Sequence, residues 1–250
     1  MRLYHTTLSE NAQSIDKHGL RLNTAKAERP NKAFTDVFNY VFNEKAGLYL
    51  PQEMQDLTID RNEAIFLSAH PEEFKKSQNL SGYEKDKDKQ DVTYEVEIDK
   101  DLPLFDSGDF TKWTEGLTEG LNGIKLISDY MGISGDNEEL EQEMFHNLMG
   151  YLIDGKRERI SQYDLSPEQI DTFEKLRIDV LSFAEKGVEA YANNGMLLSD
   201  FTQNFGYDQN EDGSFSWYGE HNNQPKKIGT LEILANEPIT TDKLERRSNK

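Results

Sequence analysis

The spacing of hydrophobic residues predicts three short strands and two helices in the first hundred residues. Residues 2–6 and 64–69 are apolar runs of strand length, and residues 92–99 alternate strictly between apolar and polar positions. Between these runs, residues 10–18 and 34–42 repeat apolar positions at intervals of three or four, which is the spacing of an amphipathic helix. The first part of the chain therefore predicts mixed α and β structure.

The middle of the chain predicts helices. Apolar residues recur at helical spacing over 138–153 and again over 166–192. The second of these segments begins with Ser166, a residue type that caps helices, and Pro167, which is favoured in a first helical turn. We expect a mainly helical block in this part of the sequence.

Strand patterns return after the helical block. Residues 205–219 predict a hairpin that turns at Asp212-Gly213. Residues 226–240 predict one strand followed by a proline turn. The last residues, 243–250, are mostly charged, and we expect them to form a frayed tail.

This order of elements predicts an α+β fold built on a single core. The core is expected to combine residues 1–106 and 205–242, because both parts carry strand patterns. Residues 107–204 are then a helical insertion. A chain of 250 residues is long enough for one large domain with such an insertion.

Composition excludes several classes of site and partner. The chain has no cysteine and a formal net charge of −19. Disulfides, zinc–thiolate sites and cysteine nucleophiles are therefore excluded. An acidic surface repels nucleic acid and anionic membranes, and no apolar run reaches the length of about 18 residues that a membrane helix needs. We expect a cytoplasmic protein without a membrane partner, acting in its own cell or delivered into another.

The first 33 residues differ in charge from the rest of the chain. They carry six basic and three acidic residues, whereas the whole chain carries 28 basic and 47 acidic residues. A basic segment suits an anionic ligand, but a few solvated lysines and arginines give the same composition. Both interpretations stay open.

Four stretches of sequence, taken in order, resemble the ADP-ribosyltransferase fold family. In that family the first strand ends in a histidine followed by small or hydroxyl residues, and a helix that stops at Gly-Leu comes next. On the second strand an aromatic residue precedes a small-residue pair, and a glutamate stands on the closing strand before a proline turn. The matching stretches are LYHTTLSENAQSIDKHGLRL at 3–22, AIFLSAHPEEF at 64–74, VTYEVEIDKDLPLFD at 92–106 and TLEILANEPIT at 230–240.

The resemblance implies a split β-sheet core and a reaction with NAD as substrate. The family transfers ADP-ribose from NAD to an acceptor and releases nicotinamide through an oxocarbenium-like transition state. The acceptor would be a macromolecule, and the acidic surface favours a protein over nucleic acid. Arg21 or Lys26 would meet the pyrophosphate of NAD. The matched pieces cover about residues 1–106 and 226–242, and residues 107–200 match nothing in the family.

The resemblance also implies roles for residues of the first two strands. His5 would bind a ribose hydroxyl, the backbone of Thr6 would hold the nicotinamide amide with Thr7 next to it, and Phe66 would stack on the nicotinamide ring. Ser68 would bond the ribose or orient the catalytic glutamate. Thr6 departs from the glycine common in the family, and Phe66 from the commoner tyrosine. All five residues also fit structural roles at strand ends or in a core.

Glu232 is the candidate catalytic carboxylate by the same resemblance. It would bond the 2′-hydroxyl of the reacting ribose and stabilise the positive charge that develops there. Because Leu231 and Ile233 flank it, its side chain should project from the opposite face of the strand, as a solvent-facing glutamate would also do. Glu220, in WYGEHN, is the rival carboxylate.

No metal site is predicted. Asp208, Asn210, Asp212 and Gly213 are spaced like the first half of a calcium loop. The twelfth position is Gly219, where such loops have a bidentate glutamate, so a polar hairpin is the favoured interpretation. The motifs of zinc proteases, serine hydrolases, P-loops and dinucleotide folds are absent from the sequence.

Two alternative functions stay open. The first is an acidic, non-enzymatic interaction or inhibitor protein, for example a nucleic-acid mimic that binds a basic partner. The second is an RNA 2′-phosphotransferase-like enzyme on the same fold. That reaction needs several arginines around a phosphate, and only Arg2, Arg21 and Arg29 are candidates.

Overall fold

The computed structural model describes residues 2–22, 32–61, 63–73, 91–114, 116, 147, 150–152, 154–163, 165–211 and 213–247. The helices are α1 (Ser9–His18), α2 (Lys32–Lys45), α6 (Pro167–Asn193) and α7 (Leu198–Asn204), with 3-10 turns η1 (Ala46–Leu48), η2 (Gln52–Met54), η4 (Arg157–Arg159), η5 (Ser161–Tyr163) and η6 (Thr241–Lys243). The strands are β1 (Arg2–Leu8), β2 (Ile65–Leu67), β3 (Asp91–Glu97), β4 (Pro103–Asp106), β5 (Met196–Leu197), β6 (Phe205–Gln209), β7 (Phe215–His221), β8 (Gln224–Ile228), β9 (Leu231–Ala235) and β10 (Leu244–Arg246).

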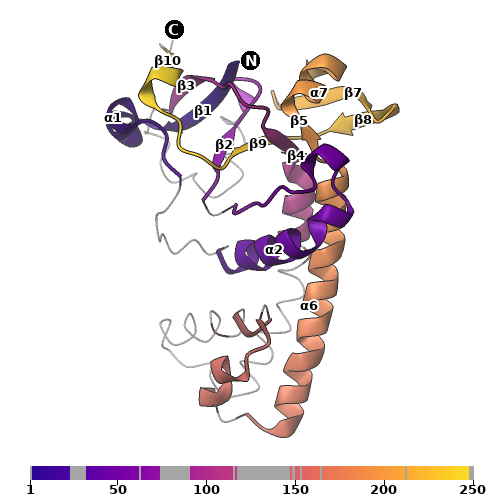
Figure 1. Ribbon diagram of the computed structural model, residues 1–250. Helices are drawn as coiled ribbons and strands as arrows, with labels where there is room; N and C mark the ends of the chain where they lie inside the picture. The colour runs from indigo at the N-terminus through magenta and orange to yellow at the C-terminus, as the bar shows by residue number, and fades with distance from the viewer. Residues whose placement is uncertain are drawn as a thin grey trace.

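These strands form three antiparallel sheets, ordered β1-β3-β10, β2-β9-β4-β5 and β6-β7-β8. The first two sheets meet where Tyr4 of β1 and Ser68, just after β2, exchange two backbone hydrogen bonds of 2.9 Å. Through this bridge β1 lies next to β2, and β2 lies next to β9. Figure 1 shows the sheets grouped at one end of the molecule, with α6 extending away from them. The α+β class predicted from the sequence is confirmed.

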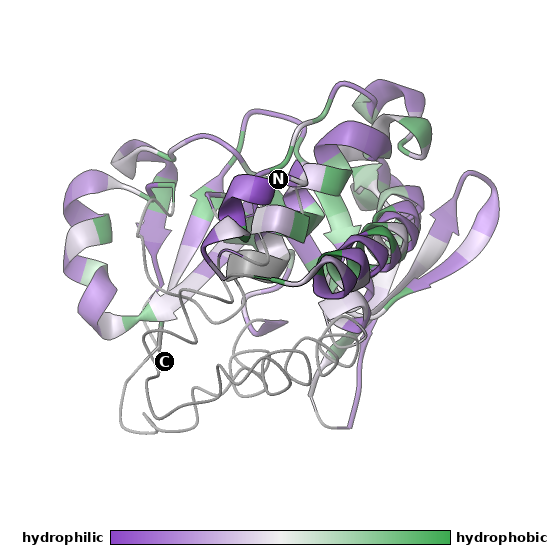
Figure 2. Ribbon diagram, turned by 90° about the horizontal axis from the view of Figure 1, so that it is seen from below, coloured by the Kyte–Doolittle hydropathy of each residue, from purple (hydrophilic) through white to green (hydrophobic). Residues whose placement is uncertain are grey.

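The sheet β2-β9-β4 separates two hydrophobic cores. Ile65, Leu67 and Ile233 point into the core that also contains α1 and α7 residues, whereas Phe66 and Leu234 point into the core that contains α2 and α6 residues. Alternate residues of a strand face opposite sides of the sheet, which explains this division. In Figure 2 hydrophobic positions are prominent on these central strands.

Helix α6 packs against α2 and β4 (Figure 1). Phe173, Val180 and Val188 of α6 lie in the same buried cluster as Val37 and Phe38 of α2. The cluster therefore joins a helix of the expected insertion to a helix of the expected core.

The amino end of α6 agrees with its sequence. The Ser166 side chain accepts a hydrogen bond from the Gln169 backbone, and the Gln169 side chain accepts one from the Ser166 backbone, with Pro167 at the start of the helix. This capping box satisfies two backbone donors that a helix end leaves unpaired.

Helix α1 ends at a position that requires glycine. Gly19 has a φ of 74°, and its backbone N–H donates to Ile15 O at 2.8 Å. A Cβ added there would overlap the backbone of Ile239. Ile239 is held close to the end of α1 because it forms an antiparallel bridge with Leu20, the residue after Gly19. The Gly-Leu stop is thus a consequence of both backbone conformation and close packing.

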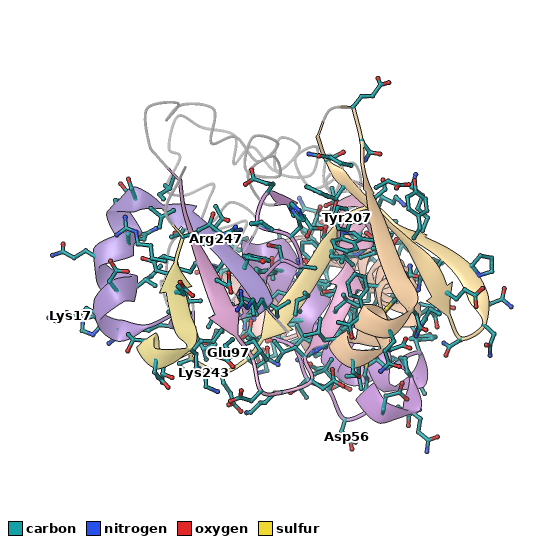
Figure 3. All side chains as sticks on the ribbon, turned by 90° about the horizontal axis from the view of Figure 1, so that it is seen from above. Lys17, Asp56, Glu97, Tyr207, Lys243 and Arg247 are labelled. Atoms are coloured by element: carbon teal, nitrogen blue, oxygen red, sulfur yellow. The ribbon has the colours of Figure 1, made fainter. Side chains whose placement is uncertain are left out.

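Two sequence predictions near the end of the chain were wrong. Residues 226–240 do not begin as one strand, because the chain turns at Gly229-Thr230 and forms β8 and β9 in different sheets. Residues 243–250 are not wholly a frayed tail, because Leu244–Arg246 pairs with β3. Lys243, labelled near Glu97 in Figure 3, forms an ion pair with Asp99 and fixes the start of this last strand.

Some predictions fall outside the described residues. They include most of the helix predicted at 138–153, together with Lys26, Arg29 and Asp212. Within the described part of the chain, no helix combines the length and apolar character needed to cross a membrane.

Candidate functional site

The histidine predicted at the end of the first strand lies in the middle of β1 and bonds β2. His5 lies on β1, and its Nδ1 is 3.1 Å from the backbone oxygen of Phe66. A carbonyl oxygen can only accept, so Nδ1 carries the hydrogen and Nε2 is left as an acceptor. Burial lowers the pKa of His5, and the bond to Phe66 opposes this effect. The ring is therefore neutral at pH 7, and its Nε2 can accept a hydrogen bond.

The hydroxyl residues near His5 are engaged by the protein itself. Thr6 is buried and its Oγ1 lies 3.1 Å from Thr93 Oγ1 across the β1–β3 pair. Thr7 accepts a 3.0 Å hydrogen bond from Asn11. Ser68 is fully buried and its hydroxyl donates to the His70 backbone oxygen at 3.0 Å. The structural roles considered for these three side chains are present.

Two predicted residues, Arg21 and Glu220, occupy exposed positions. Arg21 is exposed, one residue after the bridge between Leu20 and Ile239. Glu220 is exposed on β7, opposite Pro225 of β8. Since β7 belongs to the β6-β7-β8 sheet, the rival carboxylate does not share a sheet with Glu232.

Glu232 is buried and completely engaged. It lies on β9 between Leu231 and Ile233, and its side chain projects to the opposite face, as predicted. That face is covered, because only 4% of Glu232 is exposed, so the solvent-facing alternative is wrong. Arg61 donates from Nη2 to Oε2 at 3.0 Å and from Nη1 to Oε1, and the hydroxyl of Tyr191 also donates to Oε1.

Arg61, Glu232 and Tyr191 form one buried cluster, called here the Arg61 cluster. Arg61 Nη1 also donates to the Tyr191 hydroxyl at 2.7 Å. Burial alone would lower the pKa of Arg61, but the charge of Glu232 raises it overall. Burial and the same carboxylate raise the pKa of Tyr191 well above its ordinary value. The guanidinium therefore stays charged and the phenol stays protonated.

Aromatic rings surround the guanidinium of Arg61. Its Cζ lies 3.7 Å from the centroid of Phe110, 5.3 Å from that of Phe66, 5.5 Å from that of Tyr191 and 5.9 Å from that of Phe38. Such distances are within the range of cation–π attraction. The rings and the carboxylate together replace the water that a charged group loses on burial.

The backbone of Arg61 is fixed by α2. Its N–H donates to Asn39 Oδ1 at 3.1 Å, and Asn39 Nδ2 donates to Asp60 Oδ1 at 2.9 Å. The arginine thus enters the core from the turn before β2, held by a helix on one side and by β9 on the other.

Sequence reasoning missed Arg61 and Tyr191. Tyr191 follows Val188 at helical spacing, so its inward direction was readable, and a buried phenol needs a partner. Arg61 gave no such signal, because a single arginine in a polar turn looks solvated.

A second buried carboxyl, Glu73, was also missed. Its Oε1 accepts from Trp217 Nε1 at 3.0 Å and from the Leu231 backbone at 3.2 Å, and Oε2 has no hydrogen-bond partner among the described residues. Burial raises the pKa of Glu73 to about 7, although these hydrogen bonds oppose the shift. Glu73 links β7 to β9 on the side of the sheet away from the Arg61 cluster.

No family model, curated protein or solved structure matches this chain. The family resemblance of the sequence therefore remains a prediction.

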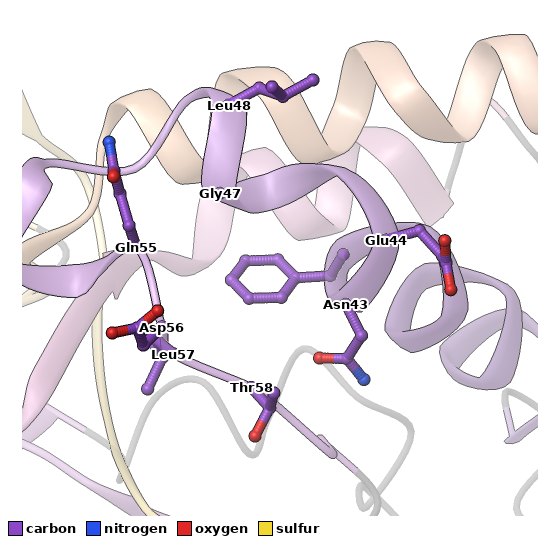
Figure 4. Close-up of a pocket in the computed structure, with 9 residues that line it drawn as sticks. Asn43, Glu44, Gly47, Leu48, Gln55, Asp56, Leu57 and Thr58 are labelled. Atoms are coloured by element: carbon purple, nitrogen blue, oxygen red, sulfur yellow. The ribbon is translucent and has the colours of Figure 1, made fainter.

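A surface pocket of about 310 Å³ lies apart from the predicted residues (Figure 4). It is lined by the end of α2 and by residues 55–58, with Glu44 and Asp56 on its walls and the exposed Leu48 at its rim. None of the catalytic or NAD-binding residues predicted from the sequence lines this pocket.

Metal binding finds no support in the described part of the chain. No group of three or more histidine, aspartate or glutamate side chains there is arranged to hold an ion. Asp208 lies on β6, which pairs with β7, and Asn210 N donates to Ser214 O at 2.8 Å, as in the polar hairpin favoured from the sequence.

Proposed function

We propose that this chain binds NAD at the junction of β1 and β2 and transfers its ADP-ribose to a macromolecular acceptor, a protein in preference to nucleic acid. The observation that carries the proposal is the 3.1 Å hydrogen bond between His5 and the Phe66 backbone. It joins the first two strands of the resemblance, and the closing strand, β9, pairs directly with β2.

The pairing brings Phe66 and Glu232 close together along the sheet. Phe66 pairs with Leu234 and Leu67 pairs with Ile233, so Glu232 is the next residue of β9. Phe66 and Glu232 also contact the same side chain, that of Arg61. Three stretches that are far apart in sequence thus supply a neutral imidazole, an aromatic ring and a carboxylate to adjoining strands.

These groups suit cleavage of a glycosidic bond. In the proposed reaction the bond between the ribose C1′ and the nicotinamide nitrogen breaks, and its electron pair leaves with nicotinamide. A nucleophile of the acceptor bonds C1′ and loses its proton. A carboxylate near C1′ stabilises the positive charge that develops on the ribose in the transition state.

The first prediction concerns His5. His5→Ala should weaken NAD binding about fivefold, since a lost hydrogen bond is worth on the order of 1 kcal/mol. Titration calorimetry measures the affinity, and circular dichroism checks the fold. His18→Ala is the matched control, because His18 is exposed at the end of α1 and should leave binding unchanged. Unaltered affinity in a folded His5→Ala protein would overturn the assignment.

The second prediction concerns the catalytic carboxylate. Glu232→Gln should not weaken NAD binding and should reduce turnover by roughly 10²–10³, because the carboxylate acts mainly in the transition state. Circular dichroism checks that the variant folds, since Arg61 loses its charged partner. The readout is release of nicotinamide and transfer of label from NAD to lysate protein. Glu220→Gln is the control, and its exposed position predicts normal turnover. The opposite result would move catalysis to Glu220, and normal turnover in both variants would contradict the transferase proposal.

One alternative is favoured by a specific observation. Glu232 is sealed by Arg61 and Tyr191, and the chain carries a net charge of −19, as an acidic interaction protein would. A complex with a basic partner together with undetectable NAD binding would support this alternative. The structure does not favour the RNA 2′-phosphotransferase alternative, which needs arginines that bind a phosphate. Arg2 forms an ion pair with Glu95 at 2.9 Å, and Arg61 forms one with Glu232.

A further inference from the structure

Arg61 contacts both groups that would contact the nicotinamide riboside of NAD. Its guanidinium lies 5.3 Å from the Phe66 ring, and it forms two hydrogen bonds with Glu232. In the proposed function Phe66 stacks on the nicotinamide ring and Glu232 bonds the adjoining ribose. Arg61 and NAD would therefore compete for the same two partners.

The guanidinium and the nicotinamide of oxidised NAD are chemically alike. Both are planar, delocalised cations that stack on aromatic rings and are stabilised by a nearby carboxylate. In the described structure the aromatic faces of Phe66, Phe110 and Tyr191 and the Glu232 carboxylate all act on the arginine. The site that would hold a flat cation already holds one.

We propose that Arg61 is a built-in competitor of the nicotinamide ring, so that the free protein is closed and NAD enters only when the arginine leaves Glu232. This inference rests on the proposed function. The closed form explains why a carboxylate assigned to catalysis is sealed by a guanidinium and a phenol. It also gives the Tyr191 hydroxyl a role, because it holds Glu232 and Arg61 together.

The competition has a measurable effect on affinity. When only a fraction of the protein is open, the apparent dissociation constant rises by the inverse of that fraction. Removing the competitor should therefore tighten the binding of oxidised NAD about tenfold or more. Glu232, left without its arginine, should also favour oxidised NAD over NADH, whose nicotinamide ring is uncharged.

The experiment compares oxidised NAD and NADH by titration calorimetry on four full-length proteins. These are the wild type, Arg61→Met, the double variant Arg61→Met/Glu232→Gln and Arg159→Met. The double variant guards against unfolding, because it leaves no unpaired charge in the core. Arg159→Met is the matched control, since Arg159 pairs with Asp154 at 3.0 Å and contacts no residue of the Arg61 cluster in any described interaction.

Competition between Arg61 and the nicotinamide ring predicts a specific pattern of affinities among the four proteins. Arg61→Met should bind oxidised NAD about tenfold tighter than the wild type and should prefer it to NADH. The double variant should keep the tighter binding and lose the preference, whereas Arg159→Met should behave like the wild type. If the wild type binds NAD and both folded Arg61 variants bind it no more tightly, the competitor is disproved and the proposed function stands. If none of the folded proteins binds NAD, both proposals fall.

Discussion

At the scale of single residues, the chain buries ionisable groups on both faces of its central sheet. Glu232 on one face is compensated by Arg61, whereas Glu73 on the other face accepts hydrogen bonds, among them those from Trp217 and Leu231. A neutral carboxyl needs less compensation than an ion. Glu73 therefore remains protonated to a higher pH than an exposed glutamate.

This difference predicts how stability depends on pH. The folded pKa of Glu73, about 7, lies above its ordinary value of 4.5, so the folded state keeps a proton that the unfolded state has lost. The free energy of unfolding should fall as pH rises from about 4.5 to about 7, by on the order of 3 kcal/mol from this residue, and then level off.

Glu73→Gln removes the titration and keeps the oxygen that accepts from Trp217. Urea unfolding at pH 5 and pH 8 should show a smaller loss of stability with rising pH in this variant than in the wild type. Glu72→Gln is the control, because Glu72 is exposed beside it. Equal pH slopes in the wild type and Glu73→Gln would contradict the prediction.

The direction of the Glu232 side chain could be predicted from sequence, but its environment could not. Alternation with Leu231 and Ile233 is a local property of a strand. The cover over that face comes from Arg61 and Tyr191, which lie 171 and 41 residues away along the chain. Nothing local in either segment indicates that they meet.

At the scale of secondary structure, local signals predicted the elements whose ends are marked by capping or turn residues in the sequence. Helix α6 has an amino-terminal capping box and a long apolar stripe, and its bounds match the prediction closely. The break between β8 and β9 was missed because Gly229-Thr230 interrupts a run that still reads as one strand. Strand β10 was missed because three residues, Leu-Glu-Arg, become a strand only through pairing with β3.

Packing between α6 and the helical residues 107–114 gives a prediction at this scale. A Cβ added at Gly187 would overlap the indole of Trp113, whose Cγ would lie 2.7 Å away. Alanine normally stabilises a helix interior by about 1 kcal/mol over glycine. Here overpacking should reverse the sign, and Gly187→Ala should lower the free energy of unfolding by about 1–2 kcal/mol.

Urea unfolding of Gly187→Ala and Ser182→Ala tests this reversal. Ser182 is exposed on the same helix, so its replacement by alanine should raise stability by a few tenths of a kcal/mol. A stabilised Gly187→Ala protein would show that Trp113 does not pack on α6 as described.

At the scale of the whole molecule, amino-acid composition predicted less about the structure than the pattern of hydrophobic and polar positions did. The α+β class followed from the order of strands and helices, and the structure confirms it. The charge of −19 describes the surface and bears on partners, but it gave no sign that an arginine and a glutamate would be buried together. The candidate site depends on three strands and one helix meeting, which is a property of the complete fold.

The length of α6 makes it a rod that connects distant parts of the protein. It contains 27 residues, and Tyr191 stands in its last turn, about 36 Å from the first residue at a rise of 1.5 Å per residue. Pivoting such a rod by only about 5° at its amino end would carry the last turn sideways by about 3 Å, which is the length of a hydrogen bond. The hydrogen bond from the Tyr191 hydroxyl to Glu232 therefore depends on the contacts that hold α6 in place along its whole length, including those at its amino end.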